Sequence, residues 1–235
     1  MNRSMRPFRW LTWRDGVLAG VGCAVAYLAW LIVTPYPRYL VPDFQEGFLS
    51  NKQEFFFSSG YFLGFYSHIF AAPVALLCGV LQFLPGLRRR FPGMHRRLGQ
   101  LYAALVLLWV APGGLVMSTR AYGGWSSVIC FALISLLTWA STFSGWRAAG
   151  RGCWKEHGRW MARSYVLMTS ALFLRLIHMV LIRTPLGHET AYQCSAWLSW
   201  LLPLAILECC LTLGAGQHSA GNKVGRTTPV YITEK

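Results

Sequence analysis

The chain has 235 residues, of which 54% are hydrophobic and 13% are charged, and its mean hydropathy is +0.39. These values are typical of integral membrane proteins and argue against a soluble globular enzyme. The net charge of +14 would suit a nucleic-acid-binding protein, but the positions of the basic residues along the chain, described below, argue against that function.

Six apolar stretches of about 20 residues recur along the chain, and this is the length that a helix needs to cross a bilayer. We therefore predict an all-α integral membrane protein with six transmembrane helices and a four-helix core made of spans 2–5. The predicted spans cover residues 16–34, 61–84, 100–119, 126–146, 160–182 and 194–214. They form one membrane domain, 16–214, between a cytoplasmic N-terminal tail, 1–15, and a disordered cytoplasmic C-terminal tail, 215–235.

The basic residues are unevenly distributed between the two sides of this predicted topology. Of the 22 lysines and arginines, 17 lie in the tails and loops that six spans place on the side of the two termini. This asymmetry is the positive-inside pattern, so we predict that this side is the cytoplasm. The charge reflects membrane topology, and we expect the lipid bilayer, rather than nucleic acid, as the partner.

The second predicted span carries a histidine and a stripe of small residues. His68 lies seven residues into the span, which is about 10 Å below its outer edge. The stripe continues from it through Ala72, Ala75, Gly79 and Gln82. Small residues allow close helix packing, or the close approach of a flat ligand, and the sequence leaves both interpretations open.

A basic hairpin follows this span and joins it to the third. It carries five arginines and one histidine within about ten residues, more than membrane orientation requires. We interpret it either as a contact for anionic lipid headgroups or as a site for a phosphate or carboxylate ligand. Its basic residues are Arg88, Arg89, Arg90, His95, Arg96 and Arg97.

The stretch from Glu156 to Val180 predicts one continuous apolar helix with ionisable residues at both ends. His157 lies at its basic foot, and Arg175 and His178 lie near its outer end, level with His68 of span 2. Ionisable groups inside a membrane span are costly, so by default they indicate a functional site. Arg175 has no acidic residue at its depth, so a bound anion or backbone carbonyls must compensate its charge.

Two neutral imidazoles from different helices can bind haem iron from both sides. We therefore predict that His68 and His178 are the axial ligands of one haem b and that Arg175 binds a propionate. The alternative is that each histidine is a hydrogen-bonded packing residue.

A second candidate site lies at the cytoplasmic ends of the spans. It comprises Gln82, His95, Arg96, His157 and Arg163. His157 and His178 are separated by about 31 Å along one helix, which is far for two stacked haems. We therefore interpret the inner group first as a headgroup, quinone or substrate site and second as a haem site. Glu208 in span 6 is predicted to pair with Arg163 or with the region of His157.

Several motifs together resemble domain-of-unknown-function family 2306, a family of bacterial multi-pass membrane proteins. They are Tyr66-Ser-His68, Ala75 to Gln82, Met94-His-Arg-Arg-Leu-Gly99 with Tyr102, His157-Gly-Arg-Trp-Met161 with Arg163, and Leu174-Arg175. The resemblance covers roughly residues 60–185 and implies that the membrane is the bacterial cytoplasmic (inner) membrane. The family's layout is similar to that of the di-haem cytochrome b and ferric-reductase-like group, which implies haem ligation; this chain has Gln82 where a second deep histidine would stand.

Three functions follow as hypotheses. The first is a b-type haem protein, if enzymatic a membrane oxidoreductase, that transfers electrons between a quinone and a redox partner protein. The second is a non-redox lipid- or anion-binding protein or a transporter, in which the inner arginines hold a headgroup. The third is a structural or assembly partner whose polar residues only fix helix packing. No P-loop, Rossmann glycine fingerprint or catalytic GxSxG or HExxH motif is present.

Overall fold

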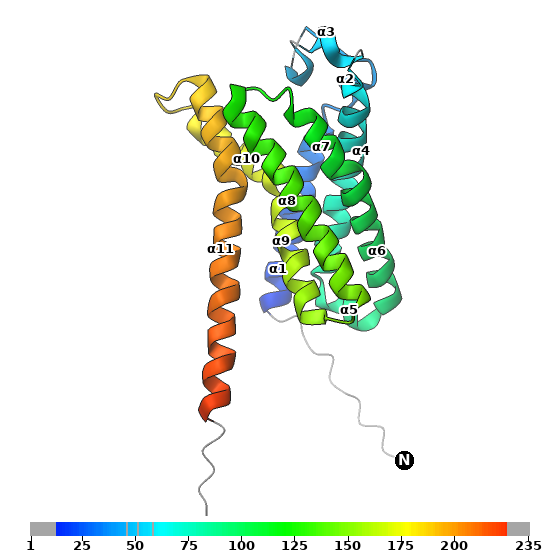
Figure 1. The fold of residues 1–235 in the computed structure, drawn as a ribbon, viewed down its shortest axis with the longest axis vertical. Coiled ribbons are helices and arrows are strands. Elements are labelled where there is room, and N and C mark those ends of the chain that lie inside the picture. The colour runs from blue at the N-terminus through cyan, green and yellow to red at the C-terminus, as the bar shows by residue number, and fades with distance from the viewer. Residues whose placement is uncertain (1–12, 46, 51, 58, 225–235) are drawn as a thin grey trace, which may run out of the picture.

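The computed structural model describes residues 13–45, 47–50, 52–57 and 59–224, and these form helices and connecting loops without a strand. Long helices run up and down between two ends of the molecule (Figure 1). They are α1 (Trp13–Val33), α4 (Tyr61–Gln82), α6 (Pro92–Leu105), α7 (Ala111–Ser118), α8 (Gly124–Gly150), α9 (Trp154–Met168), α10 (Ser170–Leu181) and α11 (His188–Val224). At the upper end lie the short α2 (Pro37–Leu40), η1 (Gly47–Leu49) and α3 (Gln53–Phe56), and at the lower end lies α5 (Pro85–Arg90).

The helices confirm the predicted all-α membrane fold, but fewer helices than the six predicted are long and apolar enough to span a membrane. Within the described residues, four helical stretches are long and apolar enough to cross a bilayer: 61–82, 92–118, 124–150 and 188–213. Helices α9 and α10 make a fifth span if they are counted together. Helix α1 occupies the first predicted span, but its qualifying apolar part, Gly22–Val33, is short. Six spans and cytoplasmic termini therefore stay predictions, although the lower ends of α1 and α11 lie on the same side of the bundle (Figure 1).

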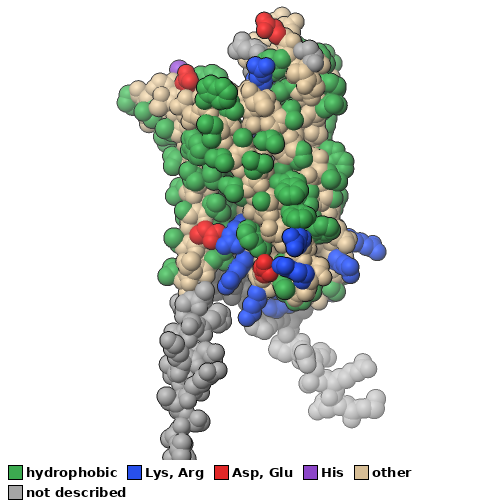
Figure 2. All heavy atoms as spheres, in the orientation of Figure 1, with side chains coloured by type: hydrophobic (Ala, Val, Ile, Leu, Met, Phe, Trp, Pro, Cys, Tyr) green, Lys and Arg blue, Asp and Glu red, His purple; other side chains and the backbone are tan. Residues whose placement is uncertain are grey.

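The surface has the character of a membrane protein (Figure 2). Hydrophobic side chains cover the middle of the visible face, and lysine and arginine side chains gather at the lower end around α5 and the start of α9. The arrangement matches the charge asymmetry in the sequence, since the basic loops converge at one end of the helices.

Helix α4 packs closely against α7 because glycines leave no side chain at the contact. A Cβ atom on Gly113 would stand 2.5 Å from the backbone oxygen of Gly64, and one on Gly114 would stand 2.9 Å from the hydroxyl of Ser135 on α8. Such separations are below van der Waals contact. The small residues therefore bring α4, α7 and α8 together around His68.

The third predicted span contains a π-helical segment, η2 (Val106–Val110), between α6 and α7. The amide of Ala111 donates to the carbonyl of Val106, five residues earlier. In this register the carbonyl of Leu107 would accept from the backbone N–H of residue 112. Residue 112 is a proline and has no N–H, so the carbonyl has no helical partner. The indole of Trp139 on α8 donates to that carbonyl instead, at 3.2 Å.

The predicted continuous helix of span 5 is wrong, because the chain bends by 41° between α9 and α10. The break lies at Thr169, whose hydroxyl donates to the carbonyl of Val166 at 2.7 Å. Threonine side chains that bond the preceding turn compete with the helical backbone and bend helices. Side chains that would share one face of a straight helix therefore point in different directions on α9 and on α10.

Helix α11 contacts the bundle mainly through its upper half and leans away below (Figure 1). There the indoles of Trp197 and Trp200 donate to Ser126 and Cys130 of α8. The helix continues to Val224, so residues 215–224 of the predicted disordered tail are helical, since no proline after Pro203 interrupts the backbone hydrogen bonds. Residues 1–12 and 225–235 of the predicted tails lie outside the described residues.

Candidate functional site

A cavity of about 260 Å³ lies among the helices near the upper end of the bundle. Its wall is formed by the end of α1, the segment that follows α1, and helices α4, α7, α8, α9 and α10. Its apolar wall includes Ile69, Ala72, Leu76, Ile134, Leu167 and Met168, and its polar wall is formed by Tyr36, Tyr39, His68, Ser135, Thr138, Ser170 and Arg175. We call it the outer cavity. It brings together His68 and Arg175, as the sequence predicted.

His68 is held in one orientation by a backbone contact. Its Nδ1 lies 2.7 Å from the carbonyl oxygen of Val110, the last residue of the π-helical segment. A carbonyl can only accept, so Nδ1 carries the proton in the neutral ring and Nε2 keeps its lone pair. Within the described part of the chain His68 makes no other hydrogen bond, so Nε2 is available to a ligand.

Among the described residues that line the outer cavity, Arg175 is the one lysine or arginine. Its Nη1 donates to the carbonyl of Ala171 at 3.0 Å, one turn earlier on α10. Among the described residues no carboxylate pairs with it; the ion pairs formed there are Arg151–Glu156 and Arg163–Glu208. The guanidinium therefore keeps most of its five donors for a ligand in the cavity.

An aromatic cluster closes the upper side of the cavity. Its buried members are Leu49, Phe56, Tyr61, Phe65 and Ile69, and Tyr36, Tyr39, Phe44 and Phe55 pack against them. We call the segment from Tyr36 to Phe57 the cap. It belongs to the outer loop whose role the sequence did not indicate. Tyr39 stands edge-on to Phe65 with ring centroids 5.4 Å apart, so the cap is packed onto α4.

The hydroxyl of Tyr36 donates to the carbonyl of Ile69 at 2.6 Å. That carbonyl lies four residues before Pro73, whose missing amide would otherwise be its helical partner. Burial raises the pKa of Tyr36 to about 12, partly offset by the charge of Arg175. The phenol therefore stays protonated at neutral pH and can donate. Sequence reasoning missed Tyr36; Pro73 indicated a free carbonyl on α4, but only the fold identifies its donor.

This hydrogen bond supports a prediction about stability. We expect Tyr36→Phe to lower the free energy of unfolding by about 1 kcal/mol, because it leaves the Ile69 carbonyl without a partner. In a Pro73→Ala background the same change is expected to cost much less, since the new amide of residue 73 bonds that carbonyl. Thermal unfolding in detergent, followed by tryptophan fluorescence, measures both; equal losses in the two backgrounds would contradict the assignment.

His178 is not part of the outer cavity. Its ring lies against α11, where it stands edge-on to Tyr192 and its Nδ1 is 3.4 Å from the hydroxyl of Ser195. Arg175, three residues earlier, lines the cavity. Both residues lie on α10, beyond the bend at Thr169, but their side chains point about 60° apart around the helix axis, and α11 packs against the side of His178. The two predicted haem ligands thus face different neighbours.

The predicted inner group lies at the lower end. Gln82 donates from Nε2 to the carbonyl of His95 at 3.0 Å, which ties α4 to the start of α6. Nδ1 of His157 lies 2.8 Å from the carbonyl of Gly145 on α8, and His95 and His157 are near enough to interact electrostatically. Arg96 is exposed. Gln82 and the two histidines therefore lie near one another, but no cavity among those described encloses them.

The predicted partner of Glu208 is confirmed as Arg163. The guanidinium binds the carboxylate through two hydrogen bonds, Nε to Oε1 at 2.5 Å and Nη2 to Oε2 at 2.8 Å. The guanidinium also stacks on the ring of Trp160, 4.8 Å from its centroid. The pair joins α9 to the lower half of α11, and Arg163 is therefore engaged in an ion pair rather than in the group around His95.

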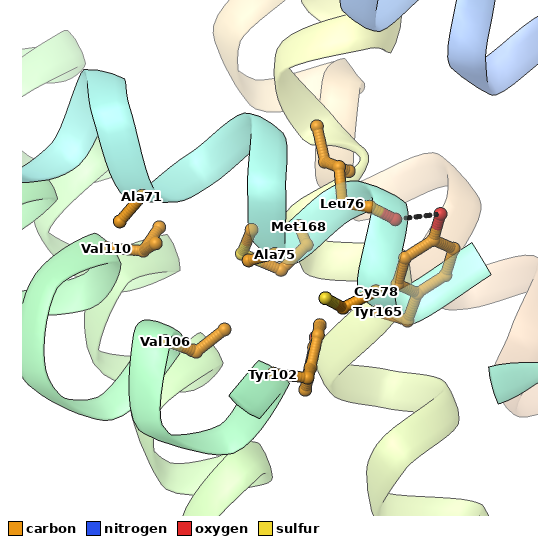
Figure 3. Close-up of a cluster of buried hydrophobic side chains, with 9 residues drawn as sticks. All are labelled: Ala71, Ala75, Leu76, Cys78, Tyr102, Val106, Val110, Tyr165 and Met168. Atoms are coloured by element: carbon orange, nitrogen blue, oxygen red, sulfur yellow. Dashed lines mark hydrogen bonds between the residues drawn. The ribbon is translucent and has the colours of Figure 1, made fainter. Parts of the chain in front are cut away.

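A cluster of buried side chains packs α4 against the third span and α9 (Figure 3). It consists of Ala71, Ala75, Leu76, Cys78, Tyr102, Val106, Val110, Tyr165 and Met168. The hydroxyl of Tyr165 donates to the carbonyl of Leu76. Close by, the Ser164 hydroxyl lies 2.7 Å from that of Tyr102 and 2.6 Å from that of Thr142. Leu76, Val110 and Met168 belong both to this cluster and to the wall of the outer cavity.

The fold and the cavity define a multi-pass α-helical membrane protein with a ligand-sized space in one half of the bundle. The chain belongs to the DUF2306 family, described as predicted membrane proteins, whose model matches residues 65–211. The match begins three residues before His68 and continues through Glu208, so it covers the predicted core and most of α11. No curated protein and no solved structure is significantly similar to the chain. The similarity to the di-haem cytochrome b layout therefore stays a hypothesis.

Proposed function

We propose that the protein binds an amphiphilic molecule with an anionic head, a carboxylate above all, in the outer cavity. The observation that carries this proposal is Arg175: an exposed cation in the wall of a cavity between apolar helices, with no carboxylate paired to it among the described residues. We place the protein in the bacterial inner membrane with its basic end in the cytoplasm, on the charge asymmetry.

Charge compensation favours this ligand. An arginine within the hydrocarbon region is costly unless it is paired, and one bond to the Ala171 carbonyl leaves most of its donors unused. A carboxylate would accept two parallel hydrogen bonds from the guanidinium. The apolar wall then contacts the rest of the ligand, and a volume of about 260 Å³ suits a compact head.

The experiment is to identify what co-purifies with the protein. Purification in mild detergent followed by extraction and mass spectrometry is expected to find one amphiphilic anion near one per chain, enriched over bulk lipid. The same extraction from Arg175→Gln should lack that enrichment. Identical extracts from the two proteins, both matching bulk lipid, would contradict the proposal.

Haem b is a second candidate, and the orientation of His68 favours it. The bond from Nδ1 to the Val110 carbonyl leaves Nε2 as the ligating atom, and Arg175 suits a propionate. Bound haem would supply one-electron chemistry between a quinone and a redox partner. The fit is partial: His68 and Arg175 line the cavity, whereas His178 contacts α11. A quinone head, with carbonyls that accept hydrogen bonds, would use the donors of Arg175.

A reduced-minus-oxidised absorbance spectrum of the purified protein tests this candidate. The expected result for haem ligation is a b-type band near one haem per chain that is lost in His68→Ala. Loss of the band in His178→Ala as well would support the predicted bis-histidine ligation, and its retention would point to His68 alone. A colourless protein after expression with ample haem would exclude the candidate.

A further inference from the structure

A second hollow lies beside the outer cavity, on the outside of the bundle between the end of α1 and α4. Trp30, Thr34, Leu40 and Phe70 are among the residues that line it. Three of these are large apolar side chains that are at least half exposed, namely Trp30 at 66%, Leu40 at 65% and Phe70 at 50%. We call this hollow the lateral groove. It opens on the lipid-facing side of the helices.

Tyr36 lines both the lateral groove and the outer cavity. Its ring therefore stands between the two spaces. It contacts Phe70 on the groove side edge-on, with centroids 6.2 Å apart, and Tyr39 on the cavity side at 6.0 Å. One hydrogen bond, from its hydroxyl to the Ile69 carbonyl, fixes its position. A path from the groove to the cavity would therefore pass this side chain.

The two spaces have complementary chemistry. The cavity contains Arg175 and His68, whereas the groove is lined by aromatic and aliphatic side chains with Thr34 as its polar member. The hydroxyl of Thr34 is bonded to the carbonyl of Leu31. An acidic head beside Arg175 and an apolar chain in the groove would satisfy both at once.

We infer that the lateral groove is the chain subsite of this ligand and that Tyr36 is the gate between it and the head site. The ligand is then a single-chain carboxylate that enters sideways from the membrane. The inference rests on the proposed function, because the head is held by Arg175. One groove reaching one small cavity accommodates one chain, which favours a fatty-acid-like molecule over a phospholipid with two chains.

Photo-crosslinking of the full chain in nanodiscs tests the inference. The probe is a fatty acid with a diazirine at mid-chain, irradiated with and without an excess of the unlabelled acid. Labelled peptides are mapped by mass spectrometry. We expect labelling of the groove segments of α1 and α4 that the unlabelled acid suppresses and its methyl ester does not.

A blocked groove provides the decisive comparison. Thr34→Trp fills the groove and is expected to reduce the suppressible labelling at least fivefold, whereas Leu77→Trp, which adds bulk at an exposed position of α4 outside both spaces, leaves it unchanged. Leu40→Trp fills the groove from the cap and serves if Thr34→Trp does not fold. Suppressible labelling that is confined to the cavity wall, or that persists in the blocked variants, would overturn the chain subsite and leave the head site standing. If the acid suppresses labelling nowhere, the proposed function itself fails and the inference with it.

Discussion

Replacement of Arg175 by glutamine is expected to reduce the affinity for a single-chain carboxylate by about 10- to 100-fold. This range corresponds to the loss of about 1.5–3 kcal/mol for hydrogen bonds to a charged partner. Glutamine keeps a donor at the site but removes the charge and the bidentate geometry. Native mass spectrometry of the protein with added fatty acid, and with the methyl ester of the same chain, measures the difference.

The ester and a second arginine are the controls. The wild-type protein should prefer the acid over the ester, and Arg175→Gln should bind both equally weakly. Arg183→Gln, at an exposed position beyond the end of α10 and outside the cavity, should retain the full preference. If Arg175→Gln keeps the wild-type preference for the acid, the head site lies elsewhere.

The second large effect concerns stability. Arg163→Met is expected to lower the free energy of unfolding by about 2 kcal/mol, somewhat below the 3–5 kcal/mol typical for breaking a fully buried pair, because both side chains are partly exposed. The reason is that the Glu208 carboxylate is left without its partner on the membrane-facing helix α11. Thermal unfolding in detergent should show a midpoint lower by several degrees.

Two comparisons isolate the ion pair. The double variant Arg163→Met, Glu208→Leu should recover most of the loss, because an apolar pair often replaces a buried ion pair at little cost. The matched control is Arg151→Met, which breaks the solvent-exposed pair with Glu156 at the lower end and should cost less than about 0.5 kcal/mol. Comparable losses in Arg163→Met and Arg151→Met would indicate that Arg163–Glu208 is an ordinary surface pair.

Sequence reasoning succeeded where depth along a helix decides a contact. Arg163 and Glu208 have opposite charges at a similar depth in predicted spans, and the fold pairs them. Arg175 and His68 were placed at one level, and both line the outer cavity. In each case the apolar stretch fixes the helix, and 1.5 Å per residue then fixes the height of the side chain.

The same reasoning failed where the contact depends on the direction in which a side chain points from its helix. Arg175 and His178 share a face on a straight helix, yet one lines the cavity and the other contacts Tyr192 and Ser195. Both residues lie on α10 beyond the bend at Thr169, so the difference comes from the angle of about 60° between their side chains and from α11, which packs against His178. The role of Tyr36 could not be predicted from the sequence either, because its hydrogen-bond partner Ile69 lies far from it along the chain.

The sequence by itself determined that this is a helical membrane protein with one basic end, because apolar length and charge asymmetry are local properties that need no knowledge of packing. Only the tertiary structure decided which ionisable groups share a space. That choice depends on a backbone bend at Thr169, on glycines that bring α4, α7 and α8 together, and on a cap that is folded over the bundle. Each of these sets the direction of a side chain through contacts between residues distant in the chain, which periodicity along one helix does not encode.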